Sequence, residues 1–167
     1  MNPLPQEVLA ARQWAIEAHG DQRYGDHPYV YHLDAVVAHL EPYGPQAQIA
    51  GYLHDVIEDT DRTQAEVEAS FGATVGRAVA LLTDAEGPNR KTRKALTYAR
   101  MGALGPEDGL ALIVKTADRL ANLIQCTTTK NKGLTRMYRK EHPAFRAAVY
   151  RAGICDPLWE RIDQIMG

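Results

Sequence analysis

The 167-residue sequence contains only two cysteines, Cys126 and Cys155, and they lack CxxC spacing. Two cysteines cannot build a disulfide framework, which fits a reducing compartment. An excess of basic charge is also missing, because 19 Lys and Arg residues against 21 Asp and Glu residues give a net charge of -2 at pH 7. Binding to duplex nucleic acid usually needs a strong basic field. We therefore expect no nucleic-acid partner.

A long hydrophobic run is absent from the start of the chain. The first 18 residues include Pro3, Pro5, Glu7, Arg12 and Glu17. Such a segment matches neither a signal peptide nor a transmembrane helix. We expect a cytoplasmic protein with no membrane partner.

The composition, with 45% hydrophobic and 24% charged residues, is typical of a globular protein. The length suits a single domain over residues 1–167, built around one hydrophobic core. Apolar residues recur at helical spacing, and sustained period-two alternation is missing, so the sequence predicts an all-α bundle with a loop at 20–31. The expected helices cover about 7–19, 32–40, 46–59, 63–71, 74–82, 89–103, 107–126, 135–150 (with a possible interruption at Pro143) and 157–165.

The pair His54-Asp55 lies within the most apolar of these segments, 46–59. An ionised carboxylate in an apolar interior costs several kcal/mol unless a cation or several donors compensate it. A divalent metal would compensate it, because imidazole and carboxylate together suit Mn²⁺, Fe²⁺ or Zn²⁺. A satisfied core histidine beside a capping aspartate is the alternative for an isolated pair.

His32 and Asp118 strengthen the metal interpretation. His32 opens a helix after a loop, and Asp118 lies in another apolar helical segment. If these two side chains converge with His54 and Asp55, they form a set of two histidines and two carboxylates that leaves room for water and substrate.

Glu58 and Asp59 follow His54 and Asp55 by four residues each. On a continuous helix, this spacing places them one turn from the expected metal ligands. A carboxylate there can take a proton from a water molecule that the metal activates. A solvated helix end is the alternative interpretation.

Three motifs resemble the hydrolase domain of the RelA/SpoT family, and more narrowly the stand-alone small alarmone hydrolases of the HD superfamily. They are HGDQRYGDHPYVYH at 19–32, YLHDVIEDT at 52–60 and KTADRLAN at 115–122. The resemblance covers residues 9–125. It implies an HD-type helical bundle that binds Mn²⁺, or another divalent metal, and removes pyrophosphate from the 3′ position of (p)ppGpp, a small-molecule nucleotide.

The resemblance also implies a role for each matching residue. The metal ligands would be His32, His54, Asp55 and Asp118, and Glu58 and Asp59 would activate and orient water. Arg23 would hold the nucleotide base, and Asn122 would contact the sugar.

Departures from the family pattern cluster where the base and the outer phosphates would bind. They include Tyr24, Gly25, Leu33, Ala121 and the basic stretch 87–94. The basic side chains of the helix expected at 89–103 form either a solvated face or a phosphate-binding surface. Two alternatives therefore stay open: a hydrolase of another nucleotide, such as an adenosine alarmone or the 2′-phosphate of NADPH, and a sensor that binds nucleotide without turnover.

Overall fold

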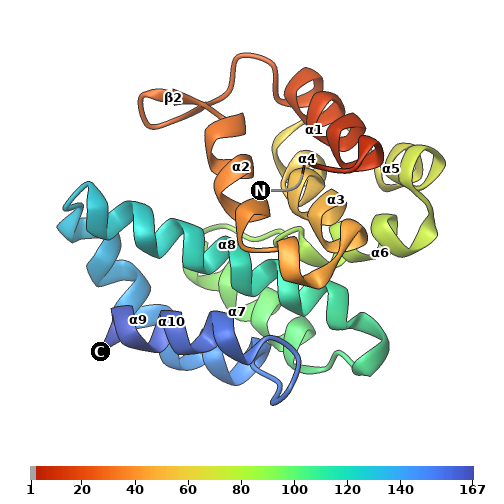
Figure 1. Cartoon of the computed structure of the whole chain (residues 1–167). Helices are drawn as coiled ribbons and strands as arrows, with labels where there is room; N and C mark the ends of the chain where they lie inside the picture. The colour runs from red at the N-terminus through yellow and green to blue at the C-terminus, as the bar shows by residue number, and fades with distance from the viewer. Residues whose placement is uncertain (1–2) are drawn as a thin grey trace. The chain divides into compact units, whose positions relative to one another are not determined.

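Helices make up nearly all the regular structure of residues 3–167, the part of the chain that this computed structural model describes (Figure 1). This confirms the predicted all-α class. The chain divides into two compact units, Met1–Thr83 and Asp84–Gly167, and each is described by itself. Within the described part of the chain, no helix is both long enough and apolar enough to cross a membrane.

The first unit is a set of short helices packed around α3. Its helices are α1 (Gln6–His19), α2 (Val30–Ala38), η1 (Glu41–Tyr43), α3 (Pro45–Leu53), α4 (Val56–Asp59), α5 (Gln64–Phe71) and α6 (Ala73–Leu82). Helix α3 contacts α1, α2 and α6. All of its residues from Ala47 to Leu53 are buried, so α3 forms the centre of this unit. A capping box between Thr63 and Glu66 is present at the start of α5, which fixes where that helix begins.

The segment 46–59 is not the single helix that its apolar pattern predicts. Helix α3 ends at Leu53, and α4 starts at Val56. In an unbroken helix the Gly51 carbonyl would accept from the backbone N–H of Asp55. Instead, His54 Nδ1 lies 2.7 Å from that carbonyl oxygen and takes its place as the donor. The side chain thus competes with the helix for a backbone acceptor, and the chain turns at the His54-Asp55 pair.

A small β-hairpin lies between α1 and α2, within the predicted loop 20–31. Strand β1 (Arg23–Tyr24) pairs antiparallel with β2 (His27–Pro28), and Gly25 has a φ of +58° in the two-residue turn. Glycine adopts this left-handed conformation without steric cost. Strands this short leave no periodic pattern, so the sequence predicts a loop only.

The second unit is built from longer helices. They are α7 (Arg90–Gly102), η2 (Pro106–Asp108), α8 (Gly109–Thr128), α9 (Lys132–Val149) and α10 (Asp156–Met166). Helix α8 packs against α9 and α10, and α7 packs against α9. Helix α9 continues through Pro143 without a break. It also begins earlier than predicted, because the Asn131 side chain caps it by accepting from Leu134 N.

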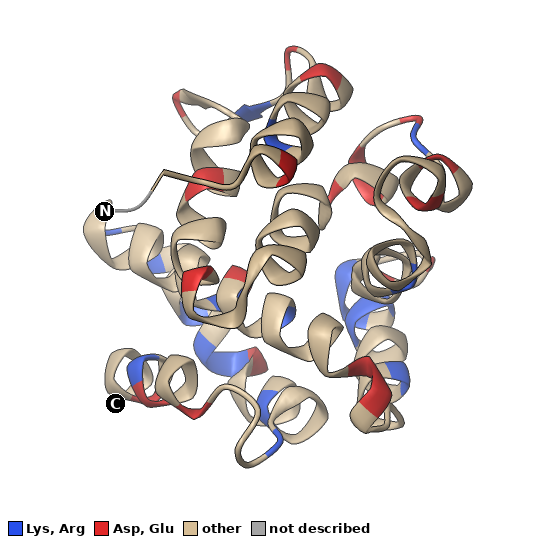
Figure 2. Ribbon diagram, turned by 45° about the vertical axis from the view of Figure 1, so that its right-hand side comes forward, with Lys and Arg blue, Asp and Glu red and all other residues tan. Residues whose placement is uncertain are grey.

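The two units differ in charge, and Figure 2 colours the acidic and basic residues on the ribbon. The first unit carries 12 of the 21 acidic residues and 4 of the 19 basic ones, which leaves 9 acidic and 15 basic residues in the second. The net charge of the whole chain is therefore near zero because an acidic unit and a basic unit nearly balance each other. An acidic unit suits a cation, and a basic unit suits an anionic ligand.

Candidate metal centre

His54 is fixed in place by its contact with Gly51. A carbonyl oxygen can only accept, so the His54 Nδ1 that lies 2.7 Å from Gly51 O must carry the proton. In the neutral ring, Nε2 then has the lone pair. This is the arrangement of metal-binding histidines, whose other ring nitrogen donates to a backbone carbonyl.

Gly51 also brings α2 close to α3. A Cβ atom at Gly51 would lie 2.5 Å from Leu40 Cδ1 and 3.1 Å from Val37 Cγ2. A larger residue would force the side chains of Leu40, which follows α2, and of Val37 in α2 to shift. The glycine therefore helps α2, which carries His32, to approach the end of α3, which precedes His54.

One carboxylate oxygen, Asp55 Oδ2, faces three side chains. It lies 2.9 Å from His54 Nε2 and 4.0 Å from His32 Nε2. The hydroxyl of Tyr29 donates to it at 2.5 Å. The two imidazole rings lie 5.4 Å apart by their centroids, and each histidine is only 3% exposed.

This donor set fits a divalent metal ion. A lone pair on His54 Nε2 and an ionised Asp55 oxygen repel each other at 2.9 Å unless a proton or a cation lies near both. Neutral imidazole and carboxylate are ligands that divalent transition metals accept together. The first unit therefore places His32, His54 and Asp55 close together as side chains that could hold a metal ion.

Glu58 and Asp59, the predicted catalytic pair, are exposed on α4. The backbone N–H of Asp59 donates to Asp55 O at 2.9 Å, so the expected four-residue spacing from Asp55 is kept. The spacing from His54 is not helical, because the break lies between α3 and α4. Gln22 Nε2 donates to Asp59 Oδ2 at 2.9 Å.

Three residues around this site had no role in the sequence interpretation: His19, Gln22 and Tyr29. His19 Nδ1 lies 2.7 Å from Gln22 Oε1, and its ring packs on that of Tyr29 with centroids 4.5 Å apart. Burial lowers the pKa of His19, although Gln22 and the nearby acids oppose that shift. His19 follows the buried Ala15 by four residues, so a histidine on the apolar face of α1 was the available signal.

Asp118 and Asn122 belong to α8, in the second unit. The amide nitrogen of Asn122 donates to Asp118 Oδ1 at 2.8 Å and to the Asp118 backbone oxygen at 3.1 Å. Asn122 thus holds the Asp118 carboxylate. Its predicted contact with a nucleotide sugar stays a prediction, as does the place of Asp118 in the metal site.

Arg23, the predicted base-contacting residue, is exposed in β1. Its guanidinium donates to the backbone oxygen of Asp26, across the turn of the hairpin. The structure thus places Arg23 on an exposed β-hairpin, and its contact with a base stays a prediction.

The basic helix α7 partly turns its charges inward. Lys94 Nζ lies 2.6 Å from Asp84 Oδ2, and Lys115 Nζ lies 3.8 Å from Asp84 Oδ1. Burial and the neighbouring Lys115 lower the pKa of Lys94, while Asp84 opposes that shift. Arg90 forms a second ion pair with Glu141 at 2.8 Å. Arg90 and Lys94 are therefore committed to ion pairs.

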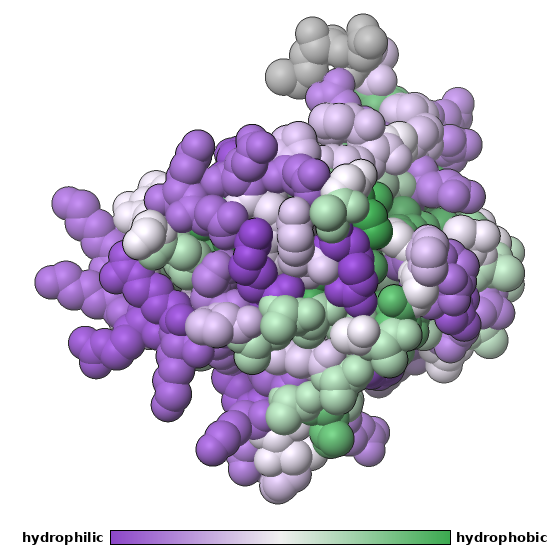
Figure 3. All heavy atoms as spheres, turned by 90° about the horizontal axis from the view of Figure 1, so that it is seen from below, coloured by the Kyte–Doolittle hydropathy of each residue, from purple (hydrophilic) through white to green (hydrophobic). Residues whose placement is uncertain are grey.

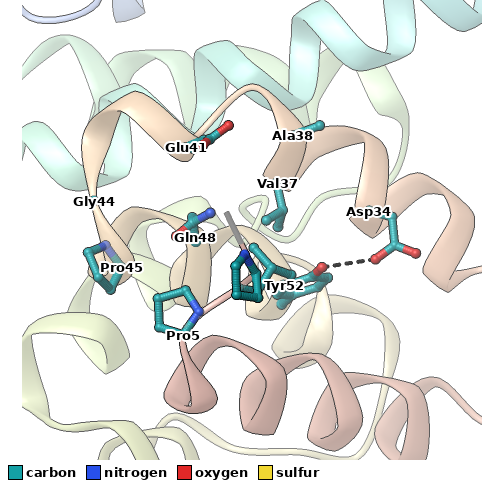
Figure 4. A pocket seen from close by; sticks show the side chains of 11 residues that line it. Pro5, Asp34, Val37, Ala38, Glu41, Gly44, Pro45, Gln48 and Tyr52 are labelled. Carbon is teal, nitrogen blue, oxygen red and sulfur yellow. Dashed lines mark hydrogen bonds between the residues drawn. The ribbon is translucent and has the colours of Figure 1, made fainter. Parts of the chain in front are cut away.

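The structure also has two hollows, one in each unit. In the first unit a cavity of about 760 Å³ is lined by the chain before α1 and by parts of α2, η1 and α3, and the Tyr52 hydroxyl donates to Asp34 at 2.9 Å on its wall (Figure 4). In the second unit a groove of about 470 Å³ follows the turn from α8 to α9, and includes Lys130, Lys132 and Arg136. Hydrophilic side chains also gather on one side of the face in Figure 3. Neither hollow is lined by His32, His54 or Asp118.

Known proteins and one family model are similar to this protein over most of its chain. A family model described as "HD domain" matches residues 11–145. The guanosine-3′,5′-bis(diphosphate) 3′-pyrophosphohydrolase MESH1 of Danio rerio is 34% identical over 167 residues, covering 95% of this chain and 91% of that protein. MESH1 of Homo sapiens is 32% identical over 152 residues, with coverages of 87% and 83%.

A solved structure of a metazoan ortholog of SpoT, described as hydrolysing ppGpp, matches with a TM-score of 0.82 and 26% identity. The match covers 99% of this chain and 96% of that one. Two longer bacterial relatives, from Aquifex aeolicus and Synechocystis, are matched over only 22% and 21% of their own lengths.

Proposed function

Because the chain belongs to the HD domain family, we propose that it is a metal-dependent hydrolase that converts ppGpp to GDP and pyrophosphate by cleavage at the 3′ position. The observation that carries this proposal is the meeting of His32, His54 and Asp55 at the break between α3 and α4. Similarity to two MESH1 proteins over most of both chains supports the substrate class.

The proposed metal site has four protein ligands: His32, His54, Asp55 and Asp118. His32, His54 and Asp118 each offer a nitrogen or a carboxylate oxygen of the kind that a divalent ion prefers, and Asp55 would add a second carboxylate. We propose Mn²⁺ as the ion, because two imidazoles with two carboxylates form a site of intermediate hardness. A divalent ion there would supply a Lewis acid and lower the pKa of a water molecule.

Glu58 and Asp59 are the proposed acid-base pair. Both carboxylates are exposed, and they lie within four residues of Asp55 on the short helix α4. An ionised carboxylate can accept a proton from the attacking water and orient it toward phosphorus. The same group, once protonated, can return the proton to the leaving 3′ oxygen.

The charge distribution favours a polyphosphate substrate. The second unit contains 15 basic and 9 acidic residues, and part of that excess lies on α7. Arg and Lys are the side chains that recognise phosphate groups. We propose that Arg23 binds the base and Asn122 the sugar, and that both units act together as one HD domain, since the family match at 11–145 spans both.

The direct test incubates the purified protein, loaded with Mn²⁺, with ppGpp. Chromatography should resolve GDP and pyrophosphate as products in equal amounts. Protein that has bound metal but leaves ppGpp intact would rule out this substrate. The same assay with an adenosine alarmone and with NADPH would identify either compound as the substrate instead.

Substitution at Glu58 separates an enzyme from a sensor. Glu58→Gln should abolish turnover and leave nucleotide binding nearly unchanged, because a neutral amide keeps the shape but cannot accept the proton. Glu68→Gln on α5 is a matched control, since the Glu68 carboxylate bonds only to the Gln64 side chain in the described part of the chain. Binding without turnover in the unmodified protein would favour the sensor.

We also propose a cytoplasmic location. A nucleotide substrate is available there, and Cys126 and Cys155 are both buried thiols outside any disulfide.

A further inference from the structure

Three side chains of the first unit form a hydrogen-bonded chain that ends on a proposed catalytic acid. His19 Nδ1 lies 2.7 Å from Gln22 Oε1, and Gln22 Nε2 lies 2.9 Å from Asp59 Oδ2. His19 is 7% exposed, whereas Asp59 is exposed on α4. These two hydrogen bonds therefore link the buried imidazole of His19 to the carboxylate of Asp59 at the surface.

The direction of each hydrogen bond follows from the chemistry of the two ends. A carboxylate only accepts, so the amide nitrogen of Gln22 must face Asp59, and its amide oxygen must then face His19. That oxygen also only accepts, so His19 must carry its proton on Nδ1. The other nitrogen, His19 Nε2, is buried and has no hydrogen-bond partner in the described part of the chain.

The backbone holds Gln22 in this position. Gln22 N donates to His19 O at 3.0 Å, and Tyr29 N donates to Gln22 O at 3.1 Å, which closes the base of the β-hairpin. The His19 ring lies against the Tyr29 ring. The Tyr29 hydroxyl in turn bonds to Asp55. The two ends of the hairpin thus contact an acid at the start of α4 and another at its end.

We propose that Gln22, oriented by His19, is a positioning residue for Asp59. Gln22 holds Oδ2, and Oδ1, which has no hydrogen-bond partner among the described residues, is then turned toward the water molecule that attacks phosphorus. This inference rests on the proposed function, because it assigns Asp59 a part in that reaction. An Asp59 carboxylate without this donor would rotate freely and would spend less time in the productive orientation.

The test compares Gln22→Leu with Gln13→Leu, both in the full chain loaded with Mn²⁺. Gln13 bonds to Glu17 on the exposed face of α1 and is a matched control. Gln22→Leu removes the hydrogen bond to the charged Asp59 carboxylate, so we expect kcat to fall about tenfold. The KM for ppGpp and the bound metal should not change, and Gln13→Leu should behave as the unmodified protein.

Variants at His19 test whether the two residues act as one unit. The amide nitrogen of an asparagine can replace Nδ1 as a donor, so His19→Asn should keep most of the activity. His19→Leu should lower kcat as far as Gln22→Leu, and the double variant should be no slower than either single one. An unchanged kcat in Gln22→Leu, loss of metal together with kcat, or additive effects in the double variant would each overturn the inference.

Nuclear magnetic resonance gives a measurement that does not depend on turnover. In protein loaded with diamagnetic Zn²⁺, the ring nitrogens of His19 should report the tautomer with the proton on Nδ1. The tautomer with the proton on Nε2 would overturn the inference. Failure of the proposed function looks different, because the unmodified protein would then leave ppGpp intact while the His19 tautomer stayed as expected.

Discussion

The hydroxyl of Tyr29 donates a hydrogen bond to Oδ2 of Asp55. The same oxygen faces His54 Nε2 at 2.9 Å, so tyrosine and histidine meet the carboxylate at one atom. Hydrogen bonds to a metal-binding carboxylate orient it and tune its affinity for the ion. Tyr29, which lies directly before α2, therefore connects the hairpin to the candidate metal centre.

Tyr29→Phe should weaken metal binding. Removal of the hydroxyl frees the Asp55 carboxylate to rotate, and we expect the metal affinity to fall roughly tenfold, the lower end of the effect of such outer partners. The phenyl ring can still pack on His19, so the fold should persist. Calorimetric titration of metal-free protein with Mn²⁺ measures the change. Tyr31→Phe is the control, since Tyr31 is 41% exposed; equal affinities in the two variants would contradict the role of Tyr29.

Asp118→Asn should release the metal. The amide has nearly the shape of the carboxylate and can still accept from Asn122, so helix α8 should be unaffected. It lacks the negative charge that would make Asp118 a good ligand for a divalent ion. Elemental analysis after gel filtration should find one metal ion per chain in the unmodified protein and little in the variant. Asp163→Asn, an exposed position on α10, should keep the metal; a fully loaded Asp118→Asn protein would exclude Asp118 as a ligand.

The helices follow closely from the sequence, because apolar spacing and capping residues act locally. The predicted bounds of α1, α6 and α10 agree with the structure within two residues. The break at His54 does not follow from the pattern, since it depends on a side chain that competes for the Gly51 carbonyl. The spacing of apolar residues indicates which face of a helix is buried, but it does not indicate that a side chain will compete for a backbone carbonyl.

The candidate site was predictable in part for a related reason. His54 and Asp55 stand out because charged and polar groups are costly in an apolar segment. Gln22 does not stand out, since a glutamine in a polar loop costs nothing there. Its bond to Asp59 joins residues 37 positions apart, and only the folded chain reveals it.

Arg119→Met should destabilise the second unit strongly. Arg119 is 5% exposed, donates to the Tyr98 hydroxyl at 2.9 Å and pairs with Glu141 at 3.3 Å. Its guanidinium also lies over the Phe145 ring, 4.0 Å from the centroid. Removal of one partner from a buried ionic network costs about 3 kcal/mol.

Urea denaturation followed by circular dichroism measures this loss of unfolding free energy. Arg139→Met is the control, since Arg139 is exposed at the surface of α9, and it should change stability by less than about 0.5 kcal/mol. Equal midpoints for the two variants would show that the Arg119 network does not stabilise the fold.

Asp84 should make stability depend on pH in the acid range. Burial raises the pKa of Asp84, but the attraction of Lys115 and Lys94 outweighs burial, so the pKa in the folded protein lies below the ordinary value of 3.8. The unfolded chain therefore takes up the proton at a higher pH than the folded chain does. The stability that ionised Asp84 contributes is present above pH 3.8 and is lost as the pH falls through the lower folded pKa.

Comparison with Asp84→Asn isolates this contribution, because all other acidic groups titrate in both proteins. The unfolding free energy, measured by urea denaturation at a series of pH values, should exceed that of the variant near neutral pH. The difference should narrow as the pH is lowered below about 4, where the unfolded carboxylate becomes protonated. Parallel curves for the two proteins would mean that Lys94 and Lys115 do not favour the ionised form of Asp84, because a carboxyl group with the same pKa in both states contributes nothing that changes with pH.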